Sequence, residues 1–293
     1  MSQFKAGFVN LFGPPNAGKS TLLNALLGEQ LVAVSPKVQT TRHRIVGILN
    51  EPQYQIIFSD TPGIIEPKYK LHQKMMASVK SAIEDADVAL LLADITQEPA
   101  EFEFIRDTLR IKAPVIFLLN KADLLKSPEA LQQKLAQYES HFPQWKALPV
   151  SASTGAGIPE LMQLILERLP EAPPYYPDDN ISDRPVRFFV SEMVREQIFH
   201  LYGDEIPYHA AVLVQAFEEK TTLTVIKADI IVSRETQKMI LLGKGGAMIK
   251  KLGIQSREKM EAFLDRKVHL ELFVKVRPKW RDNETYLREY GYQ

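Results

Sequence analysis

The sequence predicts an α/β domain with a mostly parallel, six-stranded sheet, followed by a smaller α+β domain. The first part of the chain alternates short apolar runs with helical patterns, and a proline-rich segment separates it from a part with a different rhythm. Near-continuous apolar strands separated by helices are typical of a parallel sheet that helices cover on both faces. The six apolar runs are residues 8–12, 45–49, 54–58, 88–93, 115–119 and 147–150.

Prolines mark the end of the first domain. Residues 170–177 are rich in proline, which cannot continue a helix or a central strand. We therefore predict a first domain over residues 1–174, a linker over 175–184 and a second domain over 185–293.

The second domain has its own order of elements. A helical stretch is followed by two strand-like runs, two helical segments that flank a glycine-rich loop, and a last alternating strand. The first helical stretch covers residues 185–201, and the two strand-like runs cover 210–217 and 223–232. The loop covers residues 243–246, and the last strand covers 268–276.

The composition excludes some classes of protein. The 293 residues include no cysteine, so disulfides and thiolate metal sites are excluded. The chain begins with a strand pattern rather than a secretion signal or transit peptide. No apolar run approaches the roughly 18–20 residues that span a bilayer. We expect a cytoplasmic protein.

A short region is strongly basic although the whole chain has a formal net charge of zero. Between Arg234 and Arg281 the chain has 13 Lys and Arg against 5 Asp and Glu, a net charge of +8. Such a region is typical either of a nucleic-acid contact or of a solvated face.

Residues 13–20 read Gly-Pro-Pro-Asn-Ala-Gly-Lys-Ser, the pattern of a phosphate-binding P-loop, between an apolar strand and a helix. Glycines let backbone N–H groups surround phosphate oxygens, and the helix N-terminus adds partial positive charge. The lysine is expected on the β- and γ-phosphates and the serine hydroxyl on Mg²⁺. The predicted phosphate-binding residues are Gly13, Pro14, Pro15, Asn16, Ala17, Gly18, Lys19, Ser20 and Thr21.

A second motif, Asp60-Thr61-Pro62-Gly63, follows the apolar run 54–58. A carboxylate at that strand end can hold Mg²⁺ through water, and the glycine N–H can contact the γ-phosphate. A threonine from the loop after the P-loop helix completes the predicted Mg²⁺ set of Ser20, Thr41 and Asp60. Spacing alone leaves Thr40 open as the alternative to Thr41.

The third motif is expected to select the base of the nucleotide. Asn120-Lys121-Ala122-Asp123 ends the apolar run 115–119. The aspartate carboxylate can accept the N1–H and N2 amino donors of guanine, and adenine offers no such pair. Asn120 is expected to brace the loop and Lys121 to pack its stem over the base. Ser151 and Ala152 follow the last apolar run and are expected to present a backbone N–H to the guanine carbonyl.

These motifs stand in the order of the translation-factor-related GTPases. Further stretches carry a closer resemblance: Gln-Thr-Thr-Arg-His-Arg at 39–44, Pro-Pro-Tyr-Tyr-Pro at 173–177, and Ser-Asp-Arg at 182–184 leading into Glu192, Arg195 and Glu196. With them the sequence closely resembles the Era family over essentially its whole length. The resemblance implies slow GTP hydrolysis that RNA or a cation accelerates.

The hydrolytic machinery lacks one familiar part. Ile64 stands where Ras-like GTPases have the glutamine that orients the attacking water. The expected catalytic residues are Lys19, Asn16, Thr41 and Gly63. In related GTPases an asparagine at the position of Asn16 helps to hold K⁺ against the phosphates. Our hypothesis is that Asn16 does so here, and the alternative is that it only caps the loop.

The glycine-rich loop of the second domain predicts an RNA site. Gly243, Lys244, Gly245 and Gly246 lie between two helical segments in the element order of a type II KH domain, whose GxxG loop clamps the backbone of about four nucleotides. Beyond the loop, the positions predicted to bind RNA are Ile249, Lys250, Lys251 and Arg257. The bases are expected on an apolar groove made by the helix that carries Ile249 and Leu252 and by a neighbouring strand.

The resemblance then supplies the ligand, the 3′ end region of small-subunit (16S) ribosomal RNA, and a role in assembly of the small ribosomal subunit. It also implies peripheral attachment to the inner face of the cell membrane, and we expect a monomer that binds GTP and GDP. The alternatives are an RNA-binding module with a non-switching nucleotide site and an ATP-using P-loop enzyme, which Asp123 opposes.

Overall fold

The computed structural model describes residues 4–203 and 205–292. The chain divides into two compact units. The first contains the residues up to 32 together with 41–66 and 75–183, and the second contains 33–40, 67–74 and the residues from 184 onward.

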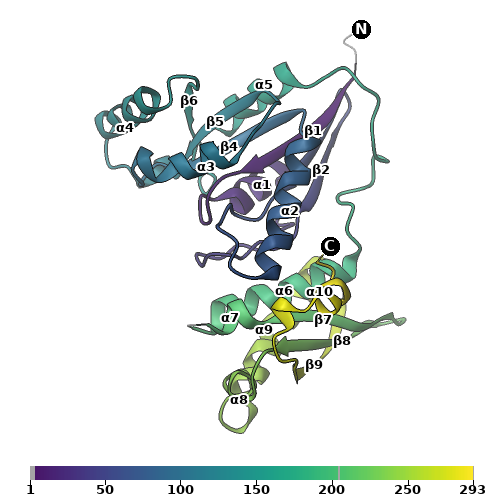
Figure 1. Cartoon of the computed structure of the whole chain (residues 1–293). Helices are drawn as coiled ribbons and strands as arrows, with labels where there is room; N and C mark the ends of the chain where they lie inside the picture. Colours follow the sequence, from purple (N-terminus) through teal and green to yellow (C-terminus); the bar gives the residue numbers. More distant parts are fainter. Residues whose placement is uncertain (1–3, 204, 293) are drawn as a thin grey trace. The chain divides into compact units, whose positions relative to one another are not determined.

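A six-stranded sheet forms the centre of the first unit (Figure 1), with the strand order β2-β3-β1-β4-β5-β6. Strand β2 runs antiparallel to β3, and every other neighbouring pair is parallel. The predicted mostly parallel sheet is therefore confirmed. The strands are β1 Lys5–Phe12, β2 Ile45–Glu51, β3 Tyr54–Asp60, β4 Val88–Asp94, β5 Val115–Asn120 and β6 Ala147–Pro149.

Helices alternate with these strands because the sequence changes from continuous apolar runs to amphipathic patterns. Val79 and Ala82 on α2 pack into the same hydrophobic cluster as Leu91 of β4. Local signals set helix ends: the Ser127 hydroxyl accepts a hydrogen bond from the N–H of Ala130 at the start of α4. The helices are α1 Lys19–Leu27, α2 Lys70–Glu84, α3 Glu103–Thr108, α4 Pro128–His141 and α5 Ile158–Arg168, with 3₁₀ turns η1 Pro99–Phe102 and η2 Ala122–Leu124.

The second unit is built on a three-stranded sheet with the order β7-β8-β9. Strands β7 and β8 are antiparallel, and β8 and β9 are parallel. The elements are α6 Val186–Leu201, α7 Ile206–His209, β7 Ala211–Glu219, β8 Leu223–Val232, α8 Glu235–Leu242, η3 Lys244–Gly246, α9 Ala247–Leu264, β9 Lys267–Val276, η4 Trp280–Asp282 and α10 Glu284–Glu289. The predicted helix–strand–strand–helix–helix–strand order is confirmed.

Two short segments from early in the chain belong to this second unit. In the segment 33–40, the N–H of Val34 donates to the Glu196 carboxylate at 3.1 Å. The guanidinium of Arg195, which is buried, donates to the carbonyl of Thr40 and to the Glu192 carboxylate. Helix α6 therefore binds a segment that precedes it by about 150 residues.

None of the helices in residues 4–203 and 205–292 combines the length and the apolar character needed to cross a lipid bilayer.

Candidate nucleotide site and RNA interface

The P-loop connects β1 to the first turn of α1, which includes Lys19, Ser20 and Thr21. Gly18 has φ +92°, and a Cβ there would lie 2.2 Å from the Asn120 amide nitrogen. Only glycine fits this close approach between the loop and the end of β5. The P-loop pattern therefore requires glycine for packing as well as for phosphate access.

Lys19 is buried, and its ammonium donates to the carbonyls of Gly13 at 3.1 Å and Pro14 at 2.8 Å. Burial lowers the pKa of Lys19 to about 8, although the nearby Asp60 carboxylate opposes this shift. A buried ammonium held only by carbonyls lacks a full counter-charge. It is suited to receive phosphate oxygens, which would supply that charge.

Three oxygen-bearing side chains meet at the predicted metal position. The Ser20 hydroxyl donates to Asp60 Oδ2 at 2.6 Å, and Thr41 Oγ1 lies 3.0 Å from the same oxygen and 2.9 Å from Ser20 Oγ. Asp60 Oδ1 is buried and has no hydrogen-bond partner among the described residues. Burial raises the pKa of Asp60, although bonds from Ser20 and Thr41 and the charge of Lys19 oppose the shift. This all-oxygen set fits Mg²⁺.

The geometry distinguishes the two candidate threonines. The Thr40 hydroxyl donates to the carbonyl of Lys37 at 2.8 Å, within the second unit. Thr41 is the threonine that the structure brings to Ser20 and Asp60.

Hydrogen bonds to β1 and to the P-loop hold the second motif, Asp60–Gly63, in place. The Thr61 hydroxyl donates to the carbonyl of Leu11 at 2.6 Å, and the Ile64 N–H donates to the carbonyl of Gly13 at 3.1 Å. These bonds fix Pro62 and Gly63 beside the P-loop. The Ile64 side chain is buried in the core cluster, so it takes no part in positioning water.

Asn120 joins three loops of the site. Its amide nitrogen donates to the carbonyl of Ala17 at 2.8 Å, and its amide oxygen accepts the N–H of Ala152 at 3.0 Å. The P-loop, the Asn120–Asp123 motif and the loop after β6 are thus held together by one side chain, the bracing role expected for it.

Asp123 is held by Ser151, whose hydroxyl donates to Asp123 Oδ1 at 2.5 Å. The backbone N–H groups of Ser151 and Ala152 have partners within the protein, the Ala156 carbonyl at 2.9 Å and Asn120 Oδ1. Ser151 therefore orients the Asp123 carboxylate, a role that the sequence pattern alone did not indicate.

The Lys121 ammonium lies 2.5 Å from Asp94 Oδ2, at the end of the neighbouring strand β4. Asp94 belongs to none of the motifs recognised in the sequence. A carboxylate that follows an apolar strand is the one signal that could have identified it.

The glycine-rich loop of the second domain, Gly243–Gly246, lies between α8 and α9 (Figure 1). Gly243 has φ +70°, and a Cβ there would lie 2.6 Å from Met248 Cγ, so the turn into α9 requires glycine. Lys244, Lys250 and Lys251 are exposed, and they form no ion pair with any residue that the structure describes. Three cations at a helix start can bind phosphates.

The surface beside this loop differs partly from expectation. Ile249 is half-buried and Leu252 is fully buried in the core, so of these two side chains Ile249 alone can contribute to the surface of a groove on α9. Helix α9 turns Leu252 inward because it packs on α6 and β9. Arg257 pairs with Glu261 at 3.5 Å, which reduces its availability to phosphate.

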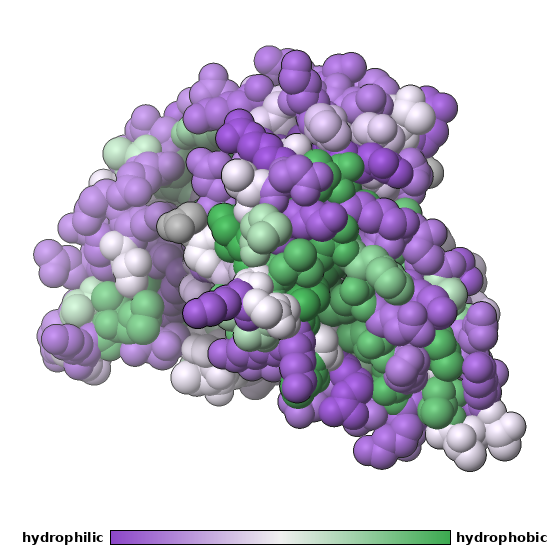
Figure 2. All heavy atoms as spheres, turned by 90° about the horizontal axis from the view of Figure 1, so that it is seen from below, coloured by the Kyte–Doolittle hydropathy of each residue, from purple (hydrophilic) through white to green (hydrophobic). Residues whose placement is uncertain are grey.

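Large apolar side chains remain exposed on the two helices that flank the loop: Met239, Ile240 and Ile254. Figure 2, the molecule seen from below Figure 1, shows hydrophobic surface gathered among hydrophilic side chains. Apolar surface next to exposed lysines suits a strand with a charged backbone and flat bases.

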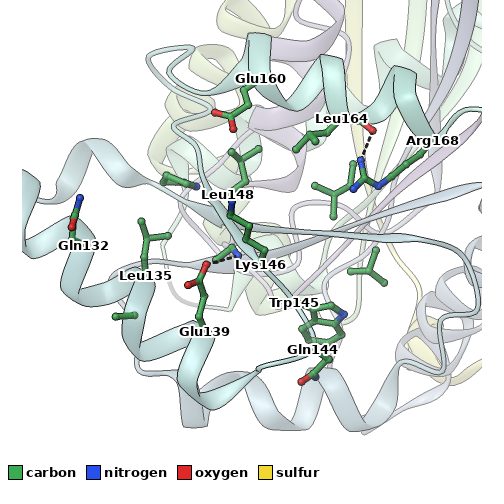
Figure 3. Close-up of a pocket in the computed structure, with 15 residues that line it drawn as sticks. Gln132, Leu135, Glu139, Gln144, Trp145, Lys146, Leu148, Glu160, Leu164 and Arg168 are labelled. Atoms are coloured by element: carbon green, nitrogen blue, oxygen red, sulfur yellow. Dashed lines mark hydrogen bonds between the residues drawn. The ribbon is translucent and has the colours of Figure 1, made fainter.

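A separate groove of about 580 Å³ lies beside β6, away from the motifs (Figure 3). It is lined by Val115 and Ile116, at the start of β5, whereas ligands of parallel sheets bind at the carboxyl ends of strands. The Ala147 N–H is bonded to the Glu139 carboxylate at 3.2 Å, and Pro149 has no N–H. This strand edge offers little to a ligand.

Comparisons with known proteins match both domains of the chain. Residues 8–121 match the family described as 50S ribosome-binding GTPase, and residues 205–281 match the KH domain. GTPase Era of Geotalea daltonii is 45% identical over 294 residues, and that of Geotalea uraniireducens is 46% identical, each match covering 99% of both chains. A crystal structure of Era with MgGDPNP and nucleotides 1506–1542 of 16S ribosomal RNA has a TM-score of 0.95 and 39% identity, covering 99% of each chain.

The fold and the nucleotide site together define a P-loop GTPase joined to a KH domain. Similarity of this extent over the whole length leaves one assignment. The chain belongs to the Era family of GTPases.

Proposed function

We propose that this chain is a GTP-hydrolysing switch that binds the 3′ end region of small-subunit rRNA through its KH domain and assists assembly of the small ribosomal subunit. The main support is that one chain combines two features. The first unit has a complete set of guanine-nucleotide motifs, and the second unit has a glycine-rich loop with exposed lysines at the start of α9. The RNA bound in the related Era crystal structure supports this choice of ligand.

In the nucleotide half, each residue has a task that its contacts support. Lys19 would exchange its two carbonyl partners for β- and γ-phosphate oxygens. Asp123 would accept the two guanine donors while Ser151 holds it in place. Ser20, Thr41 and Asp60 would hold Mg²⁺, which neutralises phosphate charge during transfer. If Thr41 binds the metal only while the γ-phosphate is present, the loop that carries Thr41 would report hydrolysis.

In the RNA half, phosphates would contact the backbone N–H groups at the start of α9 and the ammonium groups of Lys244, Lys250 and Lys251. Gly245 is exposed and leaves room for that approach, since no atom lies within 4 Å of a Cβ built on it. Bases would lie against the apolar surface of α8 and α9. The predicted domain ranges, the cytoplasmic location, the peripheral membrane contact and the monomeric state belong to the same proposal.

The proposal is tested by measuring RNA affinity and RNA crosslinking with a non-hydrolysable GTP analogue and with GDP. We expect the dissociation constant for single-stranded RNA to differ between the two states by roughly 5–150-fold, the usual range of coupling between two sites. Equal affinity and identical crosslinks in both states would instead support an RNA-binding module with a non-switching nucleotide site.

We also propose that K⁺ accelerates hydrolysis at Asn16. This residue is exposed and has φ +63°, a left-handed conformation that asparagine tolerates better than most residues. A cation there would stabilise charge on the phosphates as an arginine finger does, and no such arginine is assigned. We expect GTP hydrolysis to be at least about tenfold faster in K⁺ than in Na⁺.

The matched control for K⁺ is Asn16→Ala, which should hydrolyse GTP at the same slow rate in both salts. Equal rates in K⁺ and Na⁺ for the unchanged protein would reject the K⁺ role and leave Asn16 as a loop cap.

A further inference from the structure

A buried carboxylate lies beside the base-reading loop. Asp94 is the last residue of β4 and pairs in register with Asn120, the last residue of β5. The N–H of Ile95 donates to the Asn120 carbonyl at 3.0 Å, which locks the two strand ends together. Asp94 is 7% exposed.

Both oxygens of this carboxylate have partners. Oδ1 accepts the Thr96 N–H at 2.9 Å and the Thr96 hydroxyl at 2.6 Å, and Oδ2 accepts the Lys121 ammonium at 2.5 Å. Burial acts to raise the pKa of Asp94, but the bonds from Lys121 and Thr96 outweigh it and lower that pKa. The Asp94 carboxylate is therefore ionised at neutral pH and bonded to the Lys121 ammonium.

Lys121 is fixed at its other end as well. Its backbone has φ +68°, a conformation that L-residues rarely adopt, and its carbonyl accepts the N–H of Leu124 at 3.0 Å. The neighbouring N–H of Ala122 donates to the Val150 carbonyl at 3.1 Å. The four-carbon stem of Lys121 is thus held at its backbone and at its ammonium, between Asn120 and Asp123.

We propose that Asp94 is a positioning residue for guanine nucleotides, which holds the stem of Lys121 in place to cover the base. A free lysine side chain would lose rotamer freedom when the nucleotide binds, whereas an anchored one has lost it on folding. Asp94 acts through Lys121 and does not itself contact the ligand. This inference rests on the guanine-binding role proposed above.

The test is a double-mutant cycle on the dissociation constant for GDP, with Asp94→Asn, Lys121→Met and the double variant in the full chain. Asparagine keeps the shape of Asp94 and an oxygen for Thr96, and methionine keeps most of the Lys121 stem without the charge. We expect each single variant to bind GDP about tenfold more weakly and the double variant to bind no more weakly than the weaker single variant.

If the two single effects are independent, they multiply to a loss of about a hundredfold in the double variant, and this result would overturn the proposal. It would show that Asp94 acts through its bonds to Thr96, which persist when the Lys121 ammonium is absent. Unchanged or tighter GDP binding by Asp94→Asn would overturn it too. If Asp94→Asn does not fold, Lys121→Met decides on its own: GDP binding as tight as in the unchanged protein rejects the anchored stem.

The matched control is Asp107→Asn, which breaks an exposed ion pair with Arg106 in the same unit and should leave GDP affinity unchanged. Failure of the unchanged protein to bind GDP would refute the proposed guanine site itself. If the unchanged protein binds GDP and Asp94→Asn binds it equally tightly, only the positioning role is refuted.

Discussion

Replacing Asp123 with asparagine is expected to change the preferred base from guanine to xanthine. In the proposed site the carboxylate would accept two donors of guanine, whereas the asparagine amide would turn an N–H group towards the N2 amino group. Xanthine has a carbonyl at that position and can accept the amide donor. Because a site built on hydrogen bonds strongly rejects a mismatched ligand, we expect GTP affinity to fall by at least about a hundredfold.

The measurement is competition of labelled GTP by unlabelled GTP, xanthosine triphosphate and ATP. Asp179→Asn makes the same chemical change at an exposed position and should behave as the unchanged protein. Undiminished preference for GTP in Asp123→Asn would show that another group reads the base. Strong competition by ATP in the unchanged protein would favour an ATP-using enzyme.

Replacing Lys244 and Gly245 together with aspartate is expected to abolish RNA binding while GDP binding persists. The change places two carboxylates where phosphates would approach the start of α9, and we expect RNA affinity to fall by more than about a hundredfold. The fold should survive, because both residues are exposed and Gly245 has φ +60°, which aspartate tolerates better than most residues.

A suitable control is Lys267→Asp, which reverses one charge on an exposed side chain at the start of β9. Its RNA affinity is compared with that of the single variant Lys244→Asp. This comparison separates the loss of a local contact at the loop from a general loss of positive charge. RNA binding that persists in the double aspartate variant would move the RNA site away from the loop.

The structure brings together the side chains that the sequence predicted for the nucleotide site, because the chemistry of such a site imposes residue types at fixed spacing. A loop around phosphates needs glycines, and a metal position at a strand end needs a carboxylate such as Asp60. Asn120 and Asp123 could be assigned for the same reason. The mostly parallel sheet followed from uninterrupted apolar runs, which only doubly covered strands bury completely.

Contacts set by sheet register and helix rotation were not predictable. Asp94 reaches Lys121 only because β4 and β5 end level with each other, and no local pattern encodes that register. Leu252 and Ile249 were assigned to one helix, but helical spacing does not say which neighbour a given face will meet, and Leu252 faces the core. The backbone N–H of Ser151 was expected to contact the guanine carbonyl, and nothing in the sequence indicated that its hydroxyl would donate to Asp123.

The segment 33–40 has no helical or strand period, so nothing in the sequence assigned it to the second unit. Its consequence concerns how the protein can be divided for experiments. An RNA-binding fragment that starts at Arg184 would lose the carbonyl that Arg195 contacts and the amide that Glu196 contacts. The buried Arg195 would keep only its bonds to Glu192, and the buried Glu196 would keep its bond to Lys259. Such a fragment would be a damaged version of the domain, and its RNA affinity would understate that of the intact chain.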